Sequence, residues 1–69
     1  MPKIFVQSAI RQIEQSTPPG AARAQALEQL GNRLALAMTE TKDPHERYRL
    51  RGLQHHVLRL AEDARRATL

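Results

Sequence analysis

Two proline-containing breaks limit what this chain of 69 residues can fold into. At the first, Pro18-Pro19-Gly20, a preceding helix must end, because proline lacks an amide hydrogen and its ring clashes with the turn before it. At the second, Asp43 is followed by Pro44, an order typical of a helix start. Glu46 stands three residues after Asp43 and completes the pattern of a capping box. The breaks therefore divide the chain into three segments.

Within each segment, apolar side chains recur every three or four residues, the period of one face of an α-helix. We predict helices over about 3–15, 21–40 and 44–67, with Ser16 or Thr17 as the cap of the second helix. The three apolar stripes are Val6, Ala9, Ile10 and Ile13; Leu27, Leu30, Leu34, Ala37 and Met38; and Leu50, Leu53, Val57, Leu60 and Ala64.

The short connection between the second and third segments predicts that they pack as an antiparallel helical hairpin. The first segment is a short additional helix that either folds back on the hairpin or packs on a partner. Residues 1–69 would then form a single small three-helix domain of the all-α class. Gly31, with Ala24 and Ala35 on the same side, lets a neighbouring helix approach closely, or else it is a glycine that the helix merely tolerates.

A chain of this length has a small core, since a domain of about 60 residues buries only about 60% of its unfolded surface. It contains no cysteine, so disulfides cannot add stability. The longest early apolar run, Ile4-Phe5-Val6, is too short for a signal peptide or a membrane span. We expect a soluble, cytoplasmic protein that makes no contact with a membrane.

Patterns that support catalysis or metal binding are weak. Ser8 and Ser16 have no histidine at a recognisable spacing. On a helix, His55 and His56 would point about 100° apart, whereas metal ligands on one helix face fall three or four residues apart. We therefore expect no catalytic residue, no cofactor and no metal site, and a protein that is not an enzyme.

Basic residues are concentrated in the last part of the chain, where residues 41–69 hold seven of the 11 lysines and arginines. Arg47, Arg51 and His55 follow one another at four-residue steps and would form a ridge on one helix face. Such a ridge can track the phosphates of RNA or DNA, or it can be a solvated face without a ligand.

Three apolar side chains, Leu36, Tyr48 and Leu58, fall outside the predicted stripes. Because the core is small, they indicate a second buried face, supplied by a partner protein or by a second copy of the chain. The alternative is that the first helix covers them. These three residues are the predicted protein-binding residues.

The stretch from Leu27 to Ala64 resembles the E-type family of needle-protein co-chaperones of bacterial type III secretion systems. The resemblance is carried by Leu27-Glu28-Gln29-Leu30 and Leu34, the connector Lys42-Asp43-Pro44, then Tyr48-Arg49, Leu53, Val57 and Leu60. Members of that family are short helical hairpins that pair with a larger helical-repeat chaperone and mask the needle subunit before export. The resemblance implies a bacterial adaptor whose partner is a helical chaperone or a secretion subunit.

The sequence therefore favours a non-enzymatic helical adaptor or chaperone-like protein. One alternative is a small basic dimeric regulator that binds RNA or DNA through Arg47, Arg51 and His55. Another is a phage- or plasmid-encoded inhibitor of a host protein, which the sequence does not separate from an adaptor.

Overall fold

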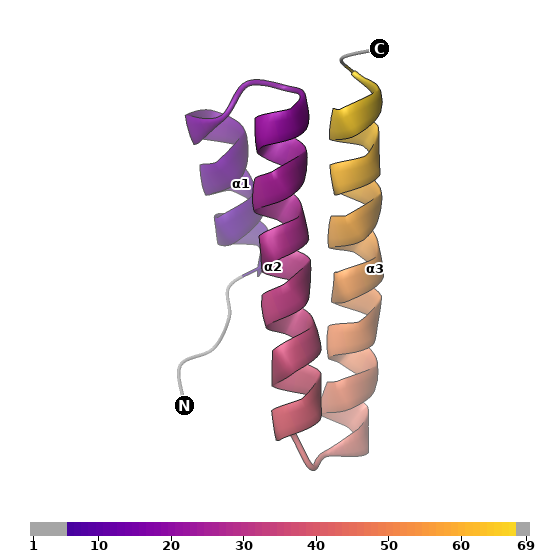
Figure 1. The fold of residues 1–69 in the computed structure, drawn as a ribbon. Helices are drawn as coiled ribbons and strands as arrows, with labels where there is room; N and C mark the ends of the chain where they lie inside the picture. The colour runs from indigo at the N-terminus through magenta and orange to yellow at the C-terminus, as the bar shows by residue number, and fades with distance from the viewer. Residues whose placement is uncertain (1–5, 68–69) are drawn as a thin grey trace.

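The computed structural model describes residues 6–67, which form three α-helices: α1 (Val6–Ser16), α2 (Ala21–Glu40) and α3 (Pro44–Arg66). Figure 1 shows α2 and α3 side by side and antiparallel, with α1 beside the half of α2 that is farther from the α2–α3 turn. The predicted all-α hairpin with a short extra helix is confirmed. Residues 3–5 of the first predicted helix lie outside the described residues, and α3 ends at Arg66, one residue earlier than predicted.

The start of α3 has the predicted cap, although the backbone nitrogen of Asp43 donates to Thr41 Oγ1 at 3.4 Å, where a capping box has it donate to the Glu46 side chain. Pro44 occupies the first helical position, and Oδ1 of Asp43 accepts a hydrogen bond from the backbone nitrogen of His45 at 3.0 Å. This bond satisfies one of the amide groups that the first turn of a helix leaves without a partner. Glu46 lies in the first turn, where negative charge suits the helix dipole, and its carboxylate pairs with Arg49.

The start of α2 differs from the prediction. Its N-cap is Gly20, at a φ of 135° that favours glycine, and no side chain caps it. Ser16 and Thr17 instead close α1: Thr17 Oγ1 donates to the Ile13 carbonyl at 2.6 Å, and Ser16 Oγ donates to the Gln12 carbonyl at 2.8 Å. The prediction was wrong because a hydroxyl before two prolines can also serve the helix that precedes it.

The core lies along the seam between α2 and α3 and extends under α1. Its buried side chains are Val6, Ile10, Ala24, Leu27, Leu30, Leu34, Leu50, Val57, Ala61 and Ala64. The remaining stripe residues, Ala9, Ile13, Ala37, Met38, Leu53 and Leu60, are partly buried against this cluster. Every residue of the predicted stripes therefore contributes to the core. Of the two alternatives predicted for the first helix, the structure has the one in which α1 folds back on the hairpin.

Gly31 is a point of close contact between the two long helices. A Cβ atom added to it would lie 2.9 Å from Cδ2 and 3.4 Å from Cγ of Leu58. Leu58 thus packs against the bare backbone of α2, although 40% of its surface remains exposed. Close packing, rather than tolerance, explains this glycine.

A binding groove at the turn end of the hairpin

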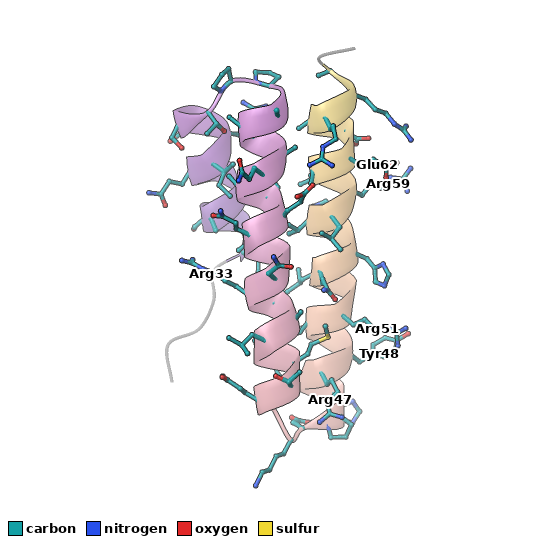
Figure 2. All side chains as sticks on the ribbon, in the orientation of Figure 1. Arg33, Arg47, Tyr48, Arg51, Arg59 and Glu62 are labelled. Atoms are coloured by element: carbon teal, nitrogen blue, oxygen red, sulfur yellow. The ribbon has the colours of Figure 1, made fainter. Side chains whose placement is uncertain are left out.

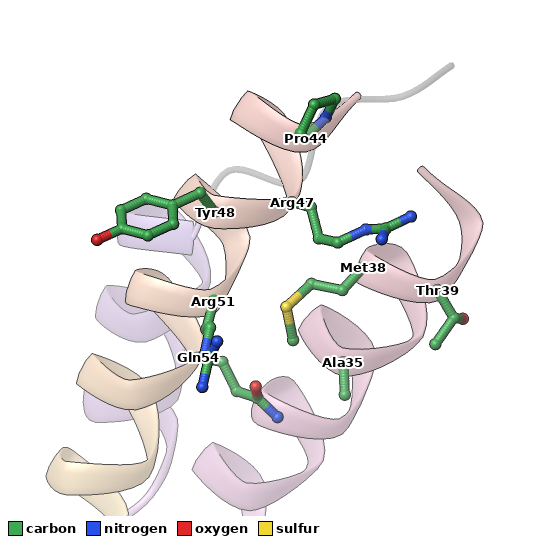
Figure 3. Close-up of a pocket in the computed structure, with 8 residues that line it drawn as sticks. All are labelled: Ala35, Met38, Thr39, Pro44, Arg47, Tyr48, Arg51 and Gln54. Atoms are coloured by element: carbon green, nitrogen blue, oxygen red, sulfur yellow. The ribbon is translucent and has the colours of Figure 1, made fainter. Parts of the chain in front are cut away.

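A groove of about 650 Å³ runs between α2 and α3 next to the turn that joins them. We call it the turn-end groove, and Figure 3 shows the eight residues that line it. They are Ala35, Met38 and Thr39 of α2 and Pro44, Arg47, Tyr48, Arg51 and Gln54 of α3. No residue of α1 lines it, and α1 lies beside the other half of the hairpin (Figure 1).

The groove is largely apolar and open to solvent. Met38 reaches from α2 toward α3 and also packs on the core, so that the floor of the groove is continuous with the core. Ala35 and Pro44 add apolar surface, whereas the ring of Tyr48, 81% exposed, points from the edge of the groove away from α2 (Figure 3). None of the eight lining residues is buried. A surface of this kind suits a segment of a macromolecule better than a small ligand, which needs an enclosing pocket.

The electrostatic character of the groove comes from two arginines, since no carboxylate lines it. Arg47 extends across the turn toward α2 (Figure 3), where its Nη2 donates to the Thr41 carbonyl at 2.8 Å. This bond serves a carbonyl that the end of α2 leaves open and holds the guanidinium at the groove. Arg51 makes no hydrogen bond or ion pair with any described residue. The groove therefore presents one anchored and one unpaired positive charge.

Three ion pairs among residues 6–67 lie away from the groove and join Arg49 to Glu46, Arg65 to Glu28, and Arg66 to Glu62. The pair from Arg65 to Glu28 links α3 to α2, and the other two lie within α3. The hydrogen bond from Arg49 to Glu46 raises the pKa of the Arg49 guanidinium. All six side chains are substantially exposed, so these pairs contribute little to stability.

The three predicted protein-binding residues do not share one surface. Tyr48 lines the turn-end groove. Leu58 follows Gln54 by four residues on the same edge of α3, which places it beyond the groove along the seam. Leu36 is 60% exposed and follows buried Leu27 by nine residues, or about two and a half helical turns. It therefore projects from the side of α2 opposite Leu27 and the core.

The predicted basic ridge of Arg47, Arg51 and His55 is exposed throughout, but only the two arginines line the groove. His55 borders a second, smaller hollow further along α3, lined by Leu58, Arg59, Glu62, Asp63 and Arg66 as well. Figure 2 shows Arg51, Tyr48, Arg59 and Glu62 projecting from α3 on the side away from α2. Because two carboxylates stand among the cations of the second hollow, the positive surface is interrupted there.

Across residues 6–67, no three histidine, cysteine or acidic side chains are grouped closely enough to hold a metal ion. No polar or charged side chain in that range is buried. None of the described helices combines the length and the apolar character that a membrane crossing requires.

Comparisons with protein-family models, curated proteins and solved structures find no match. The turn-end groove is therefore the feature on which a function can be argued.

The sequence pointed to one wall of the groove and missed the other. Arg47, Tyr48 and Arg51 were all predicted functional residues, whereas Ala35, Met38 and Thr39 on α2 were not. A signal for the α2 wall is present in the sequence: Ala35 follows Gly31 by four residues, so two small residues stand on the same edge of the helix. Leu58 fills the space next to Gly31, whereas the space next to Ala35 stays open and forms the groove.

Proposed function

We propose that this chain is a non-enzymatic helical adaptor or chaperone-like protein that binds a partner protein through the turn-end groove. The observation that carries the proposal is an open apolar groove continuous with the core through Met38. A chain with so small a core gains stability when a partner covers such a surface.

The dimensions of the groove suit a helix laid along the seam. Its lining residues on α3 run from Pro44 to Gln54, ten residue steps that span about 15 Å at about 1.5 Å per residue. That length matches about three turns of a partner helix, and a helix in an apolar groove is a common mode of recognition. If the resemblance to the secretion co-chaperones holds, the partner is a helical chaperone or a secretion subunit.

A pair of adjacent substitutions tests the proposal. Ala35→Arg places a long charged side chain in the groove, while Leu36→Arg places the same side chain about 100° around α2, at an exposed residue that does not line the groove. Tagged wild-type protein and both variants are purified from the native host after nuclease treatment, and circular dichroism checks that each is helical. We expect a stoichiometric protein partner with the wild type and with Leu36→Arg, and its loss with Ala35→Arg.

Each result of that experiment has a definite meaning. Capture of the partner by Ala35→Arg at the wild-type level contradicts the proposal. Loss of the partner with Leu36→Arg alone places the interface on the exposed side of α2 around Leu36. Recovery of a second copy of the same chain identifies a self-dimer. If the chain is encoded by a phage or plasmid, recovery of a host protein identifies an inhibitor of that protein.

Binding of RNA or DNA is the second candidate function, and one observation favours it. Arg51 is exposed and has no partner among the described residues 6–67, and Arg47 and His55 lie four residues to either side of it. For this function, the affinity for nucleic acid should fall steeply with salt and should be lost in the Arg47→Glu, Arg51→Glu double variant. A flat salt response rules the function out.

A further inference from the structure

We infer that the occupant of the turn-end groove is an acidic amphipathic helix, with its apolar side on Met38 and its carboxylates on Arg47 and Arg51. This inference rests on the proposed function and adds the chemistry of the partner. It follows from charge complementarity, because the residues that line the groove include two cations and no anion.

Arg51 is the residue that most needs such a partner. Its side chain is exposed and lines the groove, and its guanidinium has no hydrogen-bonded or ionic partner among residues 6–67. A guanidinium presents its donors in a planar fork that matches both oxygens of a carboxylate. Arg47 has one donor engaged by the Thr41 carbonyl, which fixes its position while its other donors remain available.

The spacing of the two arginines specifies the pattern of the partner. Four residues apart on α3, they are separated by about 6 Å along the helix axis. Two carboxylates three or four residues apart on a partner helix have about the same separation. The partner segment therefore carries an apolar stripe that covers Met38 and Ala35, with such a carboxylate pair along its edge.

Two other occupants fit the groove less well. A second copy of this chain would bring Arg47 and Arg51 toward the same residues of its partner, and the chain carries a net charge of +4. Nucleic acid would leave the apolar floor of Ala35 and Met38 without a matching surface. The basic ridge also meets Glu62 and Asp63 beside His55, which interrupts a path for phosphates.

The test uses a fluorescent helical peptide whose leucine stripe is flanked by glutamates four residues apart. Two companion peptides replace these glutamates by glutamine or by lysine. Fluorescence anisotropy measures the affinity of each peptide for the full chain and for Arg51→Glu. The matched control is Arg59→Glu, because Arg59 is also exposed and lies on α3 but does not line the groove.

We expect the glutamate peptide to bind about tenfold or more tightly than the glutamine peptide, and the lysine peptide to bind least. Arg51→Glu should weaken binding of the glutamate peptide by about tenfold or more, and Arg59→Glu should change it little. Equal affinity for the three peptides, or equal effects of the two variants, overturns the inference. Tighter binding of a short RNA or DNA duplex than of the glutamate peptide, lost in Arg51→Glu, also overturns it.

The Ala35→Arg variant separates this inference from the proposed function. If Ala35→Arg abolishes capture of the partner but the peptides bind without regard to charge, the groove binds a protein whose helix is not acidic. If Ala35→Arg leaves capture of the partner intact, the proposed function itself fails.

Discussion

The contact between Gly31 and Leu58 gives the sharpest test of how the hairpin packs. In an exposed helix interior, replacing glycine by alanine stabilises the folded state by about 1 kcal/mol. At Gly31 the added methyl would lie 2.9 Å from Cδ2 and 3.4 Å from Cγ of Leu58, so the leucine or the helix must move. Cδ2 is the far end of a flexible side chain that is 40% exposed, so Leu58 can give way at less than the cost of about 1–3 kcal/mol for overfilling a rigid core. We expect Gly31→Ala to raise the free energy of unfolding by less than the gain of about 1 kcal/mol at an open helix position, because the movement of Leu58 offsets part of the helical gain.

Gly52 provides the matched control, because a Cβ added there meets nothing within 4 Å. Gly52→Ala should raise the free energy of unfolding by about 1 kcal/mol, which moves the melting temperature up by about 4–8 °C in a domain of this size. In a Leu58→Ala background the obstacle is gone, and Gly31→Ala should then stabilise as Gly52→Ala does. Urea unfolding followed by circular dichroism measures all of these variants. If Gly31→Ala alone stabilises the protein as much as Gly52→Ala, the close packing at Gly31 is refuted.

Two further substitutions test the cap and the core. Asp43→Ala should lower the free energy of unfolding by about 1 kcal/mol, because the amide of His45 loses its acceptor, and an unchanged melting temperature would contradict the role of Asp43 as the cap. Leu34→Ala should cost about 2–5 kcal/mol, because Leu34 is fully buried, whereas Leu36→Ala removes a side chain that is 60% exposed and should cost far less in the same thermal melt. Similar losses from both leucines would show that the core is placed on the wrong face of α2.

The hairpin could be predicted because the sequence signals that specify it are local and recur along each helix. The stripes on α2 and α3 each recur over several turns, and Asp43-Pro44 fixes where α3 begins. Ala61 is buried without having been predicted, because alanine is common on both faces of a helix and carries little signal. The cap of α2 at Gly20 also escaped prediction, since a φ of 135° cannot be read from the residue type alone.

The groove could be predicted only in part, because it depends on which helix edges meet. Arg47, Tyr48 and Arg51 were recognised on α3 from their chemistry. Leu58 was predicted as a partner contact outside the apolar stripes, since sequence alone does not show that Gly31 faces it across the seam. The same lack of an inter-helix register explains why Leu36 was grouped with Tyr48, although Tyr48 lines the groove and Leu36 does not.

The groove and the unpaired arginine occur at the same place for a physical reason. Farther from the turn, at Gly31, Leu58 fills the space between the two long helices. Toward the turn, Ala35 is small, and the α3 residues that line the groove include Arg47 and Arg51, whose charges cannot be buried without partners. The seam therefore stays open there and leaves Met38 partly exposed. A partner that covers the apolar floor must also supply carboxylates to Arg51. The open apolar surface and the charge without a partner among residues 6–67 therefore select the same ligand.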